Sequence, residues 1–171
     1  MSAIVKKISF ENNNFFLSEE IISIFTKEVA SVVKSISGFE VINKEPYQTQ
    51  QSNEVILDYS VLLNVNSNLF KGEIYFHFDQ QLATYLIKVL TNEQVVADSK
   101  ECLDGIGELS NMFYGAIKTK LSMKGFSMNL SIPKASKSCD RLISISLTKS
   151  LFIPVEIQNN NLIIEIVKFL N

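Results

Sequence analysis

The feature that most constrains this chain is a long helical pattern over Asp98–Gly125. At about 100° per residue, its apolar side chains fall on one side of a helix: Leu103, Ile106, Leu109, Phe113, Ile117 and Leu121. A polar set falls on the opposite side: Asp104, Glu108, Asn111, Gly115 and Ser122. A helix with one apolar side packs that side on a second layer of structure. The polar side is then left open to solvent and partners, which makes it a candidate site.

Glycines within this pattern support that interpretation. Three of the six glycines of the chain, Gly105, Gly107 and Gly115, lie inside the pattern, before the Gly125 that ends it, and each costs about 1 kcal/mol relative to alanine inside a helix. Gly115 follows Asn111 by about one turn on the polar side, so the missing Cβ would let another backbone come close. We therefore interpret the polar side as a docking face that carries chemistry.

The rest of the chain predicts strands on both sides of the helices. Before the long helix come helices at Ser18–Ser37 and Asp79–Leu90, and extended segments at Phe39–Glu45, Val55–Val65 and Lys71–Phe78. After it come Ser127–Ile132, a polar loop at Lys134–Asp140, and extended segments at Leu142–Thr148, Phe152–Ile157 and Leu162–Phe169. Ser18, Asp79 and Asp98 are the expected helix caps. This order predicts an α/β (α+β) layered fold, with helices on a mixed, mostly antiparallel sheet, as a single domain over residues 1–171.

Composition excludes several classes of function. The net charge is −2 and the lysines are scattered, so no nucleic-acid partner is expected. No apolar stretch reaches the length of a membrane span, and nothing marks export, which favours the cytoplasm. Cys102, Cys139 and the single His77 are too few and too scattered for a metal site. We interpret the cysteines as reduced thiols and His77 as a structural or surface residue of a strand.

Glu108 and Asn111 form an E-x-x-N pair, a pattern that occurs four times in this chain. Only this copy lies in a helix, where residues three apart share one surface. An amide can donate to one oxygen and accept from a water, so the pair suits water positioning without a covalent step. Motifs for a phosphate loop, a serine nucleophile or a zinc protease are absent from the sequence. From the residues alone, two solvated side chains on an exposed helix are the more common explanation.

The helix sequence Asp104-Gly-Ile-Gly-Glu-Leu-Ser-Asn-Met-Phe-Tyr-Gly, followed by Ala-Ile-Lys-Thr-Lys-Leu, resembles the CheX members of the CheC/CheX/FliY phosphatase family of bacterial chemotaxis. The Leu130-Ser-Ile-Pro segment after it and Phe70-Lys-Gly-Glu-Ile-Tyr-Phe before it are also similar to the family. The resemblance covers roughly residues 69–133. It implies a CheC/CheX-like fold and, because only one helix carries E-x-x-N, the CheX type, whose members form homodimers.

The resemblance also implies a reaction. A phosphorylated response regulator of the CheY type would be the partner and its aspartyl phosphate the substrate. Asn111 would orient the attacking water and Glu108 would pair with a lysine of the regulator, with further docking positions at Asp104, Gly115, Lys118 and Ser122. The magnesium ion would belong to the regulator, so the chain would need no cofactor of its own. The alternative is a non-catalytic module of the same fold that binds a signalling or flagellar-switch protein.

Overall fold

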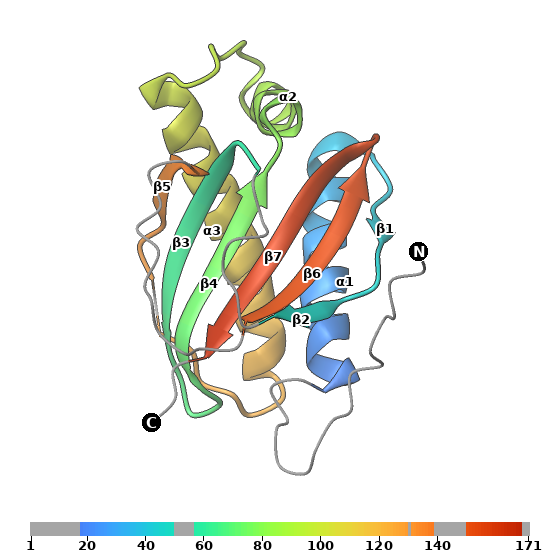
Figure 1. Ribbon diagram of the computed structural model, residues 1–171, viewed down its shortest axis with the longest axis vertical. Helices are drawn as coiled ribbons and strands as arrows, with labels where there is room; N and C mark the ends of the chain where they lie inside the picture. Colours follow the sequence, from blue (N-terminus) through green and yellow to red (C-terminus); the bar gives the residue numbers. More distant parts are fainter. Residues whose placement is uncertain (1–17, 50–56, 130, 139–149, 169–171) are drawn as a thin grey trace.

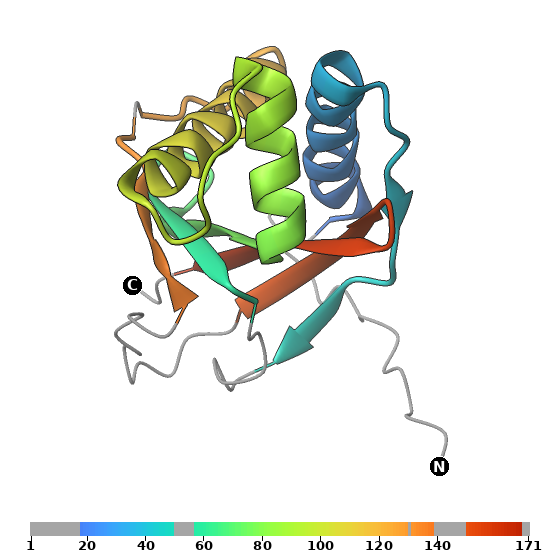
Figure 2. The same ribbon diagram turned by 90° about the horizontal axis from the view of Figure 1, so that it is seen from above.

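A computed structural model describes residues 18–49, 57–129, 131–138 and 150–168 of the 171. Three helices, α1 (Glu19–Ser37), α2 (Gln80–Thr91) and α3 (Lys100–Ser122), lie on one face of a seven-stranded sheet (Figures 1 and 2). The strands are β1 (Ile42–Asn43), β2 (Tyr47–Thr49), β3 (Tyr59–Asn66), β4 (Lys71–Phe78), β5 (Lys134–Lys137), β6 (Ser150–Ile157) and β7 (Asn160–Lys168).

The sheet order is β1-β6-β7-β4-β3-β5, with β2 also paired to β6, and every pairing is antiparallel. The predicted α+β layered fold is therefore confirmed. The core lies between the sheet and the helices. Side chains of a strand alternate between the two faces of the sheet, and Ile74, Phe76 and Phe78 of β4, which share the face toward the helices, are fully buried. Phe113 of α3 meets Phe76 at 5.4 Å and Phe78 at 6.4 Å between ring centroids, which places α3 over the middle of the sheet.

The start of α3 differs from the prediction. Ser99, not Asp98, is the N-cap, and its hydroxyl accepts from the Cys102 N–H at 3.0 Å. Asp98 has a positive φ of 64°, and its carboxylate accepts from the Tyr59 hydroxyl and pairs with Lys137 at 2.8 Å. The Lys137 ammonium, followed by the Tyr59 hydroxyl, holds the pKa of Asp98 below its usual value. Asp98 thus joins the start of the helix to β3 and β5 and does not cap it.

Asp79 stands at the N-cap position of α2 but does not cap the helix with its side chain. Its carboxylate accepts from the backbone N–H and the side-chain amide of Asn161, which lies in β7. Asp58 takes over the capping, accepting from the Gln80 N–H at 2.7 Å. A carboxylate 22 positions away replaces the local one, because Asp79 binds the neighbouring strand instead.

Several predicted strand bounds are wrong. Of the predicted strand at residues 127–132, the described residues 127–129, 131 and 132 form no strand, apart from one bridge between Met128 and Ser67, whereas the predicted polar loop begins as β5. Residues 39–45 contain only the two-residue β1, and β2 was not predicted. β1, β2 and β5 are edge strands of two to four residues, too short to show the apolar alternation of a long buried strand. The predicted strand at residues 142–148 lies outside the described residues.

Candidate functional site

The polar side of α3 faces solvent, as the periodicity predicted. Asp104, Glu108, Asn111, Gly115 and Ser122 are exposed, and Lys118 is half-buried. The opposite side is fully buried at Ile106, Leu109, Phe113, Ile117 and Leu121, while Leu103 is only partly buried. We call the surface of Asp104, Glu108, Asn111 and Gly115 the polar stripe. The two candidate groups of the E-x-x-N pair, the Glu108 carboxylate and the Asn111 amide, come from neighbouring turns of this helix.

The three glycines of α3 have different surroundings. A Cβ on Gly105 would lie 2.9 to 3.0 Å from the side chain of Ile87, so this glycine allows α2 to pack closely on α3. Among the described residues, a Cβ on Gly107 would approach Pro133 alone, at 4.0 Å, and a Cβ on Gly115 would have no neighbour within 4 Å. Gly115 therefore leaves open space within the polar stripe, and Gly105 serves internal packing.

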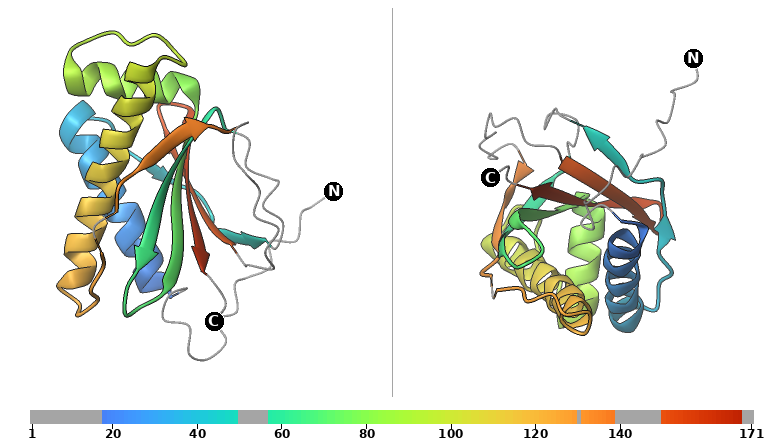
Figure 3. Two further views of the ribbon diagram at one scale, coloured as in Figure 1. Left: turned by 90° about the vertical axis from the view of Figure 1, so that its left-hand side faces the viewer. Right: turned by 90° about the horizontal axis from the view of Figure 1, so that it is seen from below.

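One flank of the polar stripe is built by the chain that follows α3. This chain turns back and returns along the helix toward β5 (Figure 3). The Tyr114 hydroxyl donates to the Asn129 carbonyl at 2.9 Å, and the Asn129 side chain accepts from the Asn66 N–H at 2.7 Å. Burial raises the pKa of Tyr114 to about 12, so its proton stays in place for this bond. The returning chain is thereby held to both α3 and β3.

Two exposed apolar side chains near the polar stripe were missed by the sequence reasoning. Met112 follows Glu108 by about one helical turn and is 38% exposed. Ile132 is 83% exposed and directly precedes Pro133, the residue that lies against Gly107. No local pattern marks Ile132 as a neighbour of the helix, because only the returning chain brings it there.

The comparisons with known proteins agree with this geometry. The family described as "Chemotaxis phosphatase CheX" matches residues 59–156, which include β3, β4, α2, the whole of α3 and β5. This chain belongs to the CheX family. No curated protein matches it significantly.

Solved structures share the fold of this CheX-family chain. A CheC-like superfamily protein from Shewanella sp. PV-4 is 23% identical with a TM-score of 0.77, covering 88% of this chain and 98% of that one. The chemotaxis protein CheX from Vibrio vulnificus is 23% identical with a TM-score of 0.73, over 86% and 98%. A CheX–CheY–BeF3–Mg2+ complex from Borrelia burgdorferi contains a chain that is 20% identical with a TM-score of 0.67, over 86% and 96%. At these identities the likeness establishes the fold.

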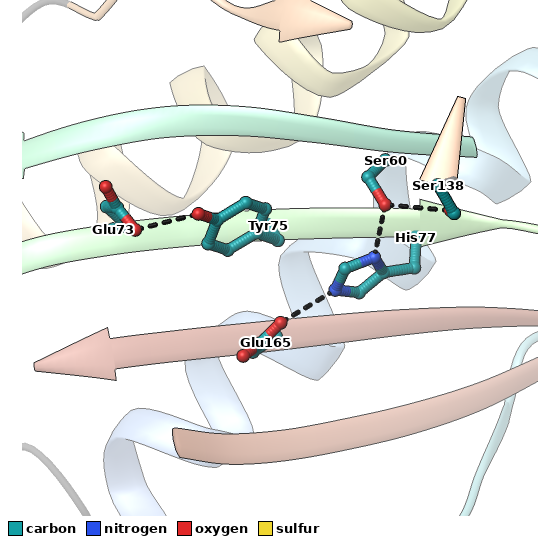
Figure 4. Close-up of polar contacts among 6 residues, drawn as sticks. All are labelled: Ser60, Glu73, Tyr75, His77, Ser138 and Glu165. Carbon is teal, nitrogen blue, oxygen red and sulfur yellow. Dashed lines mark hydrogen bonds and ion pairs between the residues drawn. The ribbon is translucent and has the colours of Figure 1, made fainter. Parts of the chain in front are cut away.

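A second polar cluster of this CheX-family chain lies on the other face of the sheet from the helices. The Nδ1 atom of His77 lies 2.8 Å from the Ser60 hydroxyl, and its Nε2 atom lies 2.9 Å from the Glu165 carboxylate (Figure 4). Ser60 also bonds to Ser138 at 3.0 Å, and the Tyr75 ring stacks on His77. His77 and Glu165 are fully buried and Ser60 is 3% exposed. The serine, imidazole and carboxylate have the composition of a nucleophilic triad, but a substrate cannot reach them, so the cluster is structural.

The thiols, metal-ligating residues and helices of the CheX-family chain can be surveyed over the residues that the structure describes. Cys102 is buried and free of any disulfide, while Cys139 lies outside the described residues. Within the described ranges, no group of three or more His, Cys, Asp or Glu residues could hold a metal ion. None of the described helices is long and apolar enough to cross a membrane. The hydroxyl of Ser110, between Glu108 and Asn111 in sequence, is buried without a hydrogen-bond partner in the described structure.

Proposed function

We propose that this chain hydrolyses the aspartyl phosphate of a CheY-type response regulator. The observation that carries the proposal is the joint exposure of Glu108 and Asn111 on one side of α3, beside the open space at Gly115. Membership in a family of chemotaxis phosphatases supports it, as does the relative from Borrelia burgdorferi that forms a complex with CheY, BeF3 and Mg2+.

The proposed reaction needs no covalent intermediate on this chain. The Asn111 amide enters the regulator's site, accepts a hydrogen bond from a water and holds that water in line with the phosphorus. The water oxygen bonds to phosphorus as the bond to the aspartyl oxygen breaks, which gives inorganic phosphate and a free aspartate. Glu108 pairs with a lysine of the regulator and fixes the orientation of the two proteins. The magnesium ion is the regulator's, and Asp104, Lys118 and Ser122 form the rim of the docking surface.

Purified protein tests the proposal directly. Added in catalytic amounts to phosphorylated CheY-type regulator with Mg2+, the chain is expected to accelerate phosphate release well beyond the regulator's own rate. The rate is followed by the loss of labelled acyl phosphate. Binding to the phosphorylated regulator without any acceleration would favour the alternative, a non-catalytic module that binds a signalling or flagellar-switch protein. The proposal places the chain in the cytoplasm, where response regulators act, and the family resemblance favours a homodimer.

Gly115→Ala separates docking from folding. A Cβ at this position meets no atom of the described residues within 4 Å, so the variant should gain about 1 kcal/mol of helix stability. The same Cβ occupies the space into which the regulator fits, and we expect the rate of dephosphorylation to fall by at least about tenfold. Thermal unfolding and phosphatase assays on one preparation measure both effects.

The matched control is Gly107→Ala. Its new Cβ would lie 4.0 Å from Pro133, an ordinary contact, and would be buried away from any partner. This variant is expected to gain similar stability and to keep the wild-type rate. A Gly115→Ala protein as active as the wild type would show that the regulator does not approach this part of α3.

A further inference from the structure

We infer that Met112 and Ile132 bind the phosphorylated regulator, one on each side of the polar stripe, and determine its affinity. The inference rests on the proposed function and concerns residues outside the E-x-x-N pair. Both side chains are exposed in this chain, at 38% for Met112 and 83% for Ile132. The proposed reaction uses polar groups, so it does not explain an exposed apolar side chain at either position.

The placement of the two residues follows from the helix and its neighbours. Successive residues of α3 turn by about 100°, so Asn111 lies toward the side of Gly107, and Met112 lies beyond Glu108 on the other side. Pro133 lies against Gly107, which brings Ile132 to the Asn111 side. The functional pair is therefore flanked by an aliphatic side chain from the returning chain and by a thioether from α3 itself.

A catalytic pair of this kind is a poor source of affinity. Glu108 and Asn111 exchange hydrogen bonds with water for hydrogen bonds with the partner, which contributes little net binding energy. Burial of exposed apolar groups removes their surface from water and contributes directly to binding, and a few well-packed residues carry most of the affinity of a typical complex. Met112 is adaptable in shape, and Ile132 protrudes from a segment that Asn129 fixes to α3 and β3.

Charge indicates a regulator as the occupant of this surface, and argues against a second copy of the chain. The polar stripe carries two carboxylates, Asp104 and Glu108, both exposed. Two copies related by a two-fold axis through this surface would bring the same patch against itself, with carboxylate facing carboxylate. A regulator whose site presents a lysine beside a phosphoryl group matches Glu108 with a cation and Asn111 with the reacting oxygens.

The test compares Met112→Ala and Ile132→Ala with two control variants. Met123→Ala and Val96→Ala also remove exposed apolar side chains, at 79% and 76% exposure, but they lie beyond the two ends of α3. We expect each flanking variant to raise the KM for phosphorylated regulator about tenfold, or 1.4 kcal/mol, with kcat within about twofold of wild type. The controls are expected to keep both constants. Titration with beryllofluoride-activated regulator should show the same loss of affinity.

Three results would overturn the inference. One is an active wild type whose KM does not change in Met112→Ala or Ile132→Ala. Another is a fall in kcat at constant KM, which would indicate a role in the chemical step. The third is a sedimentation mass that drops from two chains to one in the flanking variants, which would assign the surface to a homodimer. If wild-type protein binds the activated regulator but releases no phosphate, the proposed function fails, and weaker binding by the flanking variants would still support the inference.

Discussion

Asn111→Ala is expected to remove nearly all acceleration of regulator dephosphorylation, with kcat reduced by about 10²-fold or more. Loss of one positioned polar group at a reacting centre has effects of this size, and the proposed mechanism assigns the placement of the water to the Asn111 amide. The side chain is exposed and alanine is a better helix former than asparagine, so the folded state should be as stable as the wild type. Single-turnover phosphate release at saturating regulator measures the effect.

The control for Asn111→Ala is Lys120→Ala, an exposed position of the same helix outside the polar stripe. It is expected to keep wild-type kcat. Asn111→Asp is a stricter test, because it keeps the shape of the side chain but brings a negative charge toward the phosphoryl group. It should be as inactive as Asn111→Ala. Wild-type kcat in Asn111→Ala would refute the proposed role of the amide, whatever the behaviour of the regulator complex.

Glu165→Leu is expected to lower the free energy of unfolding by about 3 kcal/mol, because it removes the carboxylate that His77 binds in a fully buried site. The Glu165 carboxylate pairs with His77 at 2.9 Å and both side chains are fully buried. Removing the carboxylate takes from His77 the acceptor of its Nε2 proton in a site that water does not reach. Urea unfolding followed by circular dichroism measures the change.

The double variant His77→Phe, Glu165→Leu is the critical comparison. Replacing both members of a buried pair by apolar groups of similar size is often nearly neutral, so it should recover much of the stability lost in Glu165→Leu. Glu156→Leu is the matched control, because Glu156 is also a strand glutamate, pairing with Lys44 at 2.7 Å, but is partly exposed. It should change stability by less than about 1 kcal/mol. An equally small effect for Glu165→Leu would contradict the structural role of the cluster.

The sequence predicted the parts of the fold whose signals are local. The apolar period of α3, the alternation of β4 and the cap at Ser18, whose hydroxyl accepts from the Ile21 N–H, each lie within a few residues. The predicted cap of α3 was wrong, because Asp98 and Ser99 are adjacent and both are residue types that cap helices. β5 was missed because this four-residue, mostly polar strand is held by its pairing with β3 and is too short to show an apolar alternation.

The sequence predicted the exposed pair at the centre of the candidate site, and it did not predict the residues that surround the pair. Helical geometry alone places Glu108 and Asn111 on one side of α3, because the backbone period sets which residues are neighbours. The reason for Gly105 was not visible in the sequence, since it depends on how closely Ile87 of α2 approaches. The cluster of Ser60, His77 and Glu165 was likewise invisible, because its members come from three different strands.

Residues of a single helix were thus sufficient to define a carboxylate and an amide that point together into solvent. The surface on the Asn111 side depends on contacts between α3 and the chain that follows it: Tyr114 with Asn129, and Gly107 with Pro133. These contacts also set the position of Ile132. Such contacts form only when the whole core packs, because the periodicity of a helix or strand carries information about its own faces and none about which segment will cover them.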